Sequence, residues 1–352
     1  MTPHSTVSSP AAARAGAGRY RGTAITLLLA LLAGTLALGL AVGPFPLHAA
    51  DVAAALRRLL GLADAAPAPG EIVLIRVRLP RVAAAAVVGA ALSGAGACYQ
   101  TLFRNPLVSP DILGVSTGAG LGAVIGILLS LPVAGIQTLA FAGGLGTVAC
   151  VYLIAAALRG HDRTLVLVLS GVVMGALAGA CISLVKILAD PYDQLQAITF
   201  WLLGSLAGVK LDDLAMVVPL VLVGLVPLVL LRWRIGVLAL GDDEARALGI
   251  DVSRMRGLVI VAATLMTASV VAISGVIGWV GLMIPHIARM LVGPNFARLL
   301  PAAMLLGASF MLVVDMLARS IARVETPLGI LTALLGGPFF LWLLARGSRT
   351  WR

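Results

Sequence analysis

The chain has 352 residues, of which 60% are hydrophobic and only 11% are charged, and its mean hydropathy is +1.07. Soluble domains carry about 25% charged residues, so this composition excludes a soluble globular protein. Apolar runs of about 20 residues recur, and each is long enough to cross a hydrocarbon core. These runs are continuous rather than alternating, which favours helices over a β-barrel. We therefore expect an all-α integral membrane protein.

The net charge of +10 does not indicate nucleic-acid binding, because the cations lie at the ends of apolar runs without interleaved aromatic residues. Cys98, Cys150 and Cys181 lie within apolar runs, and the four histidines form no metal-ligand pattern, so we expect no metal or cofactor on this chain. The only two lysines, Lys186 and Lys210, lie outside any phosphate-binding loop. The chain therefore cannot be a P-loop ATPase by itself.

The apolar runs predict ten membrane spans within a single domain of residues 23–346. In chain order they cover about residues 23–47, 82–103, 112–129, 132–158, 165–188, 214–231, 258–273, 274–289, 301–318 and 328–344. Residues 1–22 are rich in Ala, Ser and Gly and are expected to be disordered, and residues 347–352 form a short tail. The positive-inside rule places both termini in the cytoplasm.

A polar segment at residues 241–249 interrupts the apolar runs, within a loop of residues 235–256. Acids crowd its start, with Asp242 as the expected N-cap, and Gly249 is expected at the C′ position, so we predict one exposed helix of about two turns. Flanking cations place this loop in the cytoplasm, namely Arg232, Arg234, Arg254 and Arg256. The segment is either a solvated loop helix or a docking element for a soluble partner.

Two segments on the predicted outer side are unusual. Five arginines lie between the first two spans, against the positive-inside rule: Arg57, Arg58, Arg76, Arg78 and Arg81. Either the topology is wrong there or function needs positive charge outside. The second segment, residues 190–213, contains an apolar piece at 197–206 that is too short to cross and is expected to dip into the membrane as a half-helix.

Several side chains of these segments and spans are candidates for the transport pathway. Phe200, Trp201 and Gly204 could form an outer gate, and interfacial anchoring of the aromatic residues is the alternative. Lys186 either snorkels from the fifth span or lines a cavity and attracts an anionic ligand. Asp315 in the ninth span costs about 2.5–3.5 kcal/mol on insertion scales. It is either a proton-coupling site or a structural partner of an arginine or a backbone group.

One histidine follows a proline in the glycine-broken eighth span. His286 could ligate haem iron, and a hydrogen bond at the Pro285 kink is the simpler alternative.

Five motifs in order carry a resemblance to a known family: RLPR (78–81), NPLVSPDILGVSTGAGLGA (105–123), ALGDDEARALGI (239–250), SGVIGWVGLMIPHIAR (274–289) and ETPLGILTALLGGPFF (325–340). With them, the chain from about residue 24 to 346 resembles the FecCD family, the permease subunits of bacterial ABC importers for iron–siderophores, haem and vitamin B12. The resemblance implies a type II ABC importer permease fold with ten transmembrane helices per subunit, paired as a homodimer in the inner membrane. It also implies two partner ATPase subunits inside, which hold ATP and Mg, and a periplasmic binding protein outside.

The resemblance also implies roles for particular residues. It assigns ATPase coupling to Asp242, Asp243, Glu244, Ala245, Arg246, Ala247, Leu248 and Gly249. It assigns binding-protein docking to Arg78, Arg81 and Arg319, with Arg323 as a rival because the spacing from Arg319 to Glu325 is about one residue short of the family pattern.

The cargo implied is an iron chelate, with haem first because residues 198–205 resemble haem-permease versions of that segment. Vitamin B12 and ferric siderophores are the alternatives. No nucleophile–base or metal constellation is visible, so we expect no catalytic residues and no enzyme. An ion-coupled secondary transporter that uses Asp315 is the remaining rival.

Overall fold

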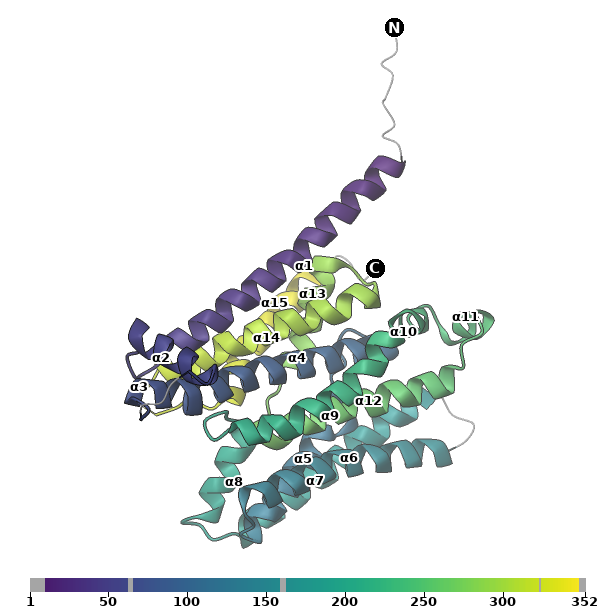
Figure 1. The fold of residues 1–352 in the computed structure, drawn as a ribbon. Coiled ribbons are helices and arrows are strands. Elements are labelled where there is room, and N and C mark those ends of the chain that lie inside the picture. The colour runs from purple at the N-terminus through teal and green to yellow at the C-terminus, as the bar shows by residue number, and fades with distance from the viewer. Residues whose placement is uncertain (1–9, 63–65, 159–162, 323, 348–352) are drawn as a thin grey trace.

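The structure is a computed structural model that describes residues 10–62, 66–158, 163–322 and 324–347. These residues form helices and connecting turns without a β-strand, as predicted (Figure 1). The helices are α1 (Pro10–Ala41), α2 (Ala49–Leu59), α3 (Pro69–Ile72), the π-helical turn η1 (Val73–Arg78), α4 (Leu79–Leu102), the 3-10 turn η2 (Pro110–Leu113), α5 (Val115–Leu128), α6 (Val133–Ala157), α7 (Arg163–Leu188), α8 (Gln194–Leu203), α9 (Leu211–Leu230), α10 (Arg232–Leu238), α11 (Asp242–Ala247), α12 (Val252–Ser274), α13 (Val280–Val292), α14 (Phe296–Ser320) and α15 (Leu328–Gly347).

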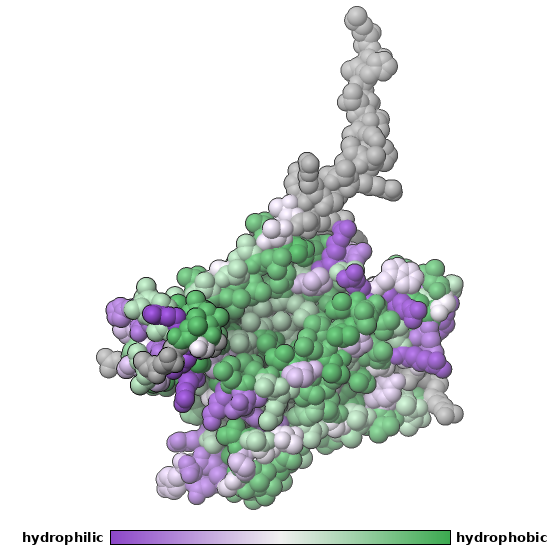
Figure 2. All heavy atoms as spheres, in the orientation of Figure 1, coloured by the Kyte–Doolittle hydropathy of each residue, from purple (hydrophilic) through white to green (hydrophobic). Residues whose placement is uncertain are grey.

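Seven helices of the described residues are long and apolar enough to cross a membrane. Three shorter apolar helices, at Val115–Leu128, Val280–Val292 and Leu328–Leu343, account for the remaining predicted spans. Figure 2 shows the resulting surface, a broad apolar waist with hydrophilic side chains gathered at two opposite ends. A bilayer favours this distribution, because the apolar waist meets hydrocarbon while the charged ends stay in water.

Helix α1 begins at Pro10, well before the predicted start of the first span at residue 23. Proline is favoured at the first helical position, and the alanines that follow have the highest helix propensity. Residues 10–22 continue the first span as part of α1, and the expected disorder of residues 1–22 stays a prediction. Residues 1–9 and the tail residues 348–352 lie outside the described part of the chain.

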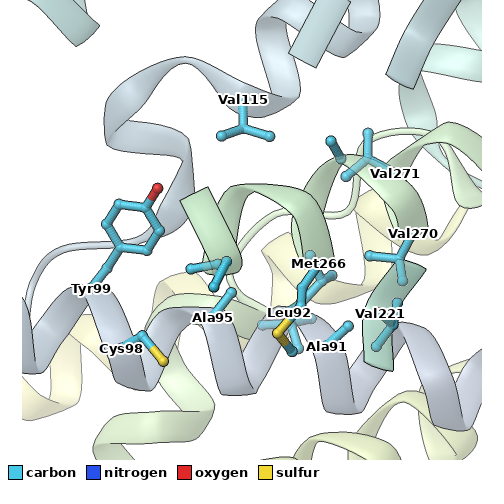
Figure 3. Close-up of a cluster of buried hydrophobic side chains, with 14 of the residues drawn as sticks. Ala91, Leu92, Ala95, Cys98, Tyr99, Val115, Val221, Met266, Val270 and Val271 are labelled. Carbon is cyan, nitrogen blue, oxygen red and sulfur yellow. The ribbon is translucent and has the colours of Figure 1, made fainter. Parts of the chain in front are cut away.

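Helix α4 is the central helix of the bundle and packs against α12, α13 and α14 (Figure 1). In the most apolar window of Pro69–Leu102, 78% of residues are buried, against 28% for α7. Small residues allow this packing, since a Cβ added at Gly89 would overlap the carbonyl oxygen of Gly307 on α14. Figure 3 shows the core that results, where α4 meets side chains from α5, α9 and α12.

The two polar ends of the bundle carry different elements. Helices α10 and α11 lie at one end, while α2, α3 and α8 lie at the opposite end (Figure 1). We refer to them as the α11 end and the α8 end. The predicted coupling residues therefore lie on the far side of the bundle from the predicted docking and gate residues.

Candidate functional site

Helix α11 at the α11 end forms as predicted, with one change at its start. Gly241, not Asp242, occupies the N-cap position, and Asp242 is the first helical residue. The reason is a tertiary contact. The Asp242 carboxylate accepts from the Arg256 guanidinium of α12 at 3.1 Å instead of from a backbone N–H of the first turn of α11. The acids of the first turn still complement the helix dipole.

The end of α11 closes in the predicted way. Gly249 has a φ of 77°, the left-handed conformation that glycine tolerates. Its N–H donates to Arg246 O at 2.9 Å, and the N–H of Ile250 donates to Ala245 O at 3.0 Å. This pair of bonds is a Schellman motif, with the buried Ile250 and Ala245 as its apolar contact. Gly249 at C′ is thus confirmed.

A carboxylate at the start of α11 joins three parts of the chain. Asp242 contacts Arg256 at 3.1 Å, Arg104 of the turn after α4 at 3.9 Å and Arg246 of its own helix at 4.0 Å. The pair with Arg256 is the most sheltered, since only 9% of the Arg256 side chain is exposed. The Arg246–Asp243 pair at 2.8 Å is solvated and adds little stability. Asp242 therefore fixes α11 against α12 and the end of α4.

The outward face of α11 mixes charge with apolar area. Ala245 is fully buried, whereas Ala247 and Leu248 are exposed, and Leu240 just before the helix is exposed by 64%. The exposed remainder of the predicted coupling set comprises Asp243, Glu244, Arg246 and Gly249. Beside the helix is a hollow of about 550 Å³, the α11 hollow, lined by Arg104, Thr164, Leu240, Gly241, Asp242, Asp243, Glu244, Arg246, Val252, Ser253 and Arg256. An anchored helix with a partly apolar face suits protein docking better than simple solvation.

The predicted docking arginines gather at the α8 end around a second hollow of about 440 Å³. We call it the arginine hollow, and it is lined by Pro44, Phe45, Val73, Val77, Arg78, Arg81, Arg319, Ala322 and Glu325. Arg323, the rival candidate, lies outside the described residues.

Arg78 caps the end of α1. Its guanidinium donates to the carbonyl oxygens of Leu40 and Ala41, both at 2.7 Å, and to that of Phe45. A helix end leaves its last carbonyls without intrahelical partners, and these bonds satisfy them. The π-helical turn η1 carries Arg78, whose side chain is nearly fully buried.

Arg81 and Arg319 share the carboxylate of Asp315 inside the bundle. Arg81 Nε donates to Asp315 Oδ1 at 2.7 Å, and Arg319 Nε lies 3.1 Å from Asp315 Oδ2. The remaining N–H groups of Arg319 reach Gly39 O on α1 at 3.2 Å and the O of Val42, the residue after α1, at 3.1 Å. The interpretation of Asp315 as a structural partner of an arginine is confirmed.

Glu325 completes this cluster and was not among the predicted site residues. Its carboxylate forms a bidentate pair with the Arg81 guanidinium, with both N–O distances 2.8 Å. It is the first residue of the ETPLG motif, and an acid placed directly before an apolar span was the available signal.

The three described arginines are therefore not free cations at the surface. Arg78, Arg81 and Arg319 are each turned inward onto carbonyl oxygens or carboxylates. Docking would need cations that project toward a partner, whereas Arg78 and Arg81 are buried in the structure. The cause is tertiary, because buried Asp315 and the open end of α1 each need hydrogen-bond donors, and the fold brings the arginines to them.

Helix α8 is the short helix predicted for the gate segment, and its aromatic residues face different ways. Phe200 is 57% exposed, whereas Trp201 packs against the buried core. Gly204 ends the helix with a φ of 74°, and it interlocks with Gly275 at the end of α12. A Cβ on Gly275 would overlap the carbonyl oxygen of Trp201, so only glycine allows this close approach.

Lys186 and His286, the two remaining candidates, line neither the α11 hollow nor the arginine hollow. Lys186 is half-buried in the last turn of α7, and no ion pair of the described residues involves it. The ring of His286 lies edge-on to Phe339, with the centroids 6.5 Å apart. Its Nδ1 is buried without a hydrogen-bond partner, so that nitrogen does not form the expected bond at the Pro285 kink.

Comparisons with known proteins agree on one family. The model of the FecCD transport family matches residues 28–346. A Helicobacter pylori protein named "Probable iron chelatin transport system permease protein" is 43% identical, covering 78% of this chain and 83% of its own. The molybdate import system permease protein of Haemophilus influenzae is 39% identical over 92% of this chain and 96% of its own.

Further relatives are named for cobalamin, haemin and Fe(3+)-citrate import. Among solved structures, an inward-facing conformation of a protein assigned to the metal-chelate type of ABC transporters matches with a TM-score of 0.82. That match is 38% identical and covers 92% of this chain and 98% of the other.

Proposed function

The chain belongs to the FecCD transport family, and we propose that it is the permease subunit of an ABC importer whose cargo is an iron chelate, with haem as the first candidate. The family match spans nearly the whole helical bundle, so the described domain as a whole is a multi-pass membrane permease. A permease of this class works with partner ATPase subunits, which hold ATP and Mg, and with a binding protein that delivers cargo. The proposed location is a bacterial inner membrane.

The coupling proposal is carried by α11. It is a rigidly anchored helix with exposed acids, Arg246 and Leu248 on its outward face, at the end of the bundle opposite the arginine hollow. Cations at this end, including Arg104, Arg254 and Arg256, favour the cytoplasmic side. The start of α1 and the end of α15 lie toward the same end (Figure 1), which supports cytoplasmic termini. ATP-driven closure of the ATPases would thus move α11, and through Asp242 it would move α12 and α4.

The haem proposal is carried by the resemblance of residues 198–205 to haem permeases, together with relatives named for iron chelatin and haemin. Molybdate is the second candidate, because the molybdate relative matches 92% of the chain. Cobalamin is the third.

The cargo is tested in proteoliposomes that contain this chain, its ATPase and its binding protein. Uptake of haem, molybdate and cobalamin is measured side by side with ATP inside, and liposomes without the ATPase serve as the control. We expect haem uptake to exceed the other two by about tenfold, which corresponds to about 1.4 kcal/mol of discrimination. Equal or greater molybdate or cobalamin uptake overturns the haem assignment and leaves the importer class intact.

We further propose that the permease is a homodimer with the cargo pathway between two copies. Helix α8 is too short to cross, and the backbone that follows it at Gly204–Ala207 is non-helical. Non-helical backbone at membrane depth needs protein or a water-filled cavity beside it rather than lipid. Exposed apolar side chains of α7, such as Leu169 and Leu184, offer area for a second copy.

The oligomeric state is measured by light scattering of the detergent-purified chain, with the detergent contribution subtracted. We expect a protein mass twice the 35.9 kDa of one chain. A mass of one chain under conditions that preserve transport on reconstitution contradicts the homodimer.

A further inference from the structure

Glu325 connects the arginine hollow to the gate segment. Its carboxylate accepts two hydrogen bonds from Arg81, and its Oε1 also accepts from the Ser205 hydroxyl at 3.0 Å. Ser205 directly follows Gly204, the residue that ends α8. One side chain therefore joins the α4 arginine to the end of the gate helix.

Two backbone hydrogen bonds also hold the end of α8 to neighbouring segments. The N–H of Ser205 donates to Ser274 O at 2.9 Å, and the N–H of Leu328 donates to Gly204 O at 3.0 Å. At the start of the helix, the Gln194 amide donates to Leu128 O at 3.0 Å. Glu325 provides the side-chain bond at the Ser205 end, and it lies on the same short segment as Leu328. A shift of that segment would loosen both contacts together.

The two acids of the cluster differ in their freedom to move. The Asp315 side chain has no exposed area, so it cannot leave its arginines without a large desolvation cost. The Glu325 side chain is 27% exposed and borders the arginine hollow. It can therefore exchange Arg81 for water or for another partner, while Asp315 stays in place.

The charge of the hollow favours an incoming acid. Three arginines and two carboxylates meet there, so the cluster of Arg78, Arg81, Arg319, Asp315 and Glu325 has a formal charge of +1, from three positive and two negative groups. An Asp or Glu side chain of a docked protein carries the same group as Glu325 and fits a hollow of about 440 Å³. Its carboxylate can form the bidentate pair that Glu325 now forms with the Arg81 fork.

We propose that Glu325 is a displaceable internal counter-ion, which an acidic side chain of the docking binding protein replaces on Arg81, thereby freeing Ser205 and the end of α8. The proposal rests on the importer function and adds a route from docking to the gate. Glu325 acts as a positioning residue, because it reaches the gate only through Ser205. Docking thus loosens α8 and exposes its buried face, which carries Ile198.

The reporter is the reactivity of a cysteine on α8. Ile198→Cys, at a position of α8 whose side chain is fully buried, is placed in a background with Cys150→Ser and Cys181→Ser, which removes the two exposed native cysteines and keeps the buried Cys98. The full complex with its ATPase is reconstituted without ATP. The rate of modification by a maleimide is then measured with and without the cognate binding protein, whose affinity is determined in parallel.

Two variants separate the Glu325–Ser205 contact from the docking of the binding protein on Arg81. Ser205→Ala removes the hydroxyl, which donates to Glu325 and accepts from the Ala207 N–H at 3.1 Å, and it leaves the Arg81 pair intact. Glu325→Gln removes the internal carboxylate that competes for Arg81. The matched control is Thr199→Ala, which removes a hydroxyl of the same helix whose hydrogen bond stays within α8 at Leu195 O.

We expect the binding protein to accelerate labelling of the background about fivefold, the factor that corresponds to one hydrogen bond of ordinary strength. Ser205→Ala should label at that faster rate without the binding protein and bind it with unchanged affinity. Glu325→Gln keeps an oxygen that can accept from the Ser205 hydroxyl but loses the charge on Arg81, so it should label as the background does and bind the protein several-fold more tightly. Thr199→Ala should behave as the background does.

Two results overturn the proposal that Glu325 is displaced from Arg81 and releases the end of α8. One is labelling that does not respond to the binding protein although the protein binds. The other is a Glu325→Gln variant that binds the protein more weakly, since that makes Glu325 part of the docking surface and not its competitor. Absence of any binding-protein association contradicts the proposed function itself, so the two failures are distinguishable.

Discussion

Replacing Asp315 with alanine is expected to lower the free energy of unfolding by about 3–5 kcal/mol, the cost of leaving buried charges without their partner. The Asp315 side chain has no exposed area and is paired with Arg81 at 2.7 Å and with Arg319 at 3.1 Å. Without it, two guanidinium groups from α4 and α14 remain close together inside the bundle. The change is measured by titrating the purified protein in mixed micelles with a denaturing detergent and following helix content.

The matched control for this prediction is Ser309→Ala on the same helix. The Ser309 hydroxyl is buried too, but it bonds only to Leu305 O of its own helix at 2.9 Å. Its removal is expected to cost less than about 1 kcal/mol. If Asp315→Ala costs no more than Ser309→Ala, the cluster does not hold α4 against α14. Asp315 would then again be a candidate for ion coupling.

The second large effect is expected at α11, where Ala247→Arg should reduce ATP-driven uptake by about tenfold or more while the permease stays folded. Ala247 is the last residue of the helix and is exposed. An arginine there suits the helix dipole, so α11 itself is preserved. Forcing an arginine side chain into a packed protein interface costs about 1–3 kcal/mol, so docking of the ATPase is weakened. Uptake and ATPase stimulation are measured in the same proteoliposomes.

Ala157→Arg is the control for this substitution. Ala157 is likewise an exposed alanine at the end of a helix, α6, and α7, which follows it, contributes Thr164 to the α11 hollow. It adds the same charge near the same end of the bundle without touching α11. We expect coupling within about twofold of the unsubstituted protein, the effect of a surface substitution away from contacts. Equal loss in both variants would mean that added charge, not α11, is responsible.

The sequence predicted α11 well because its signals are local. The acids of the first turn and the Gly249 cap act within a few residues, and the structure confirms both. The one error, Asp242 as N-cap, arose because Arg256 in the next helix takes its carboxylate. The small residues of α4 are a similarly local feature, and the structure places Gly89 at a close crossing with Gly307 of α14.

The arginine cluster shows what the sequence does not contain. Arg78, Arg81 and Arg319 were identified as important, but their surroundings were not. Arg81 and its acids are separated by 234 and 244 residues, so only the fold brings them together. Burial of a charge depends on such distant partners, which hydropathy and spacing do not report. For the same reason the role of Ser205 beside Glu325 could not be predicted from either segment alone.

The central claim is that this permease moves its cargo only when a partner hydrolyses ATP. The most direct test is haem uptake into proteoliposomes containing this chain, its ATPase and its loaded binding protein, with ATP or a non-hydrolysable analogue inside. The account predicts uptake with ATP, and none above background with the analogue or with Ala247→Arg. Uptake that proceeds equally with the analogue would contradict it, because α11 would then have no energy to transmit.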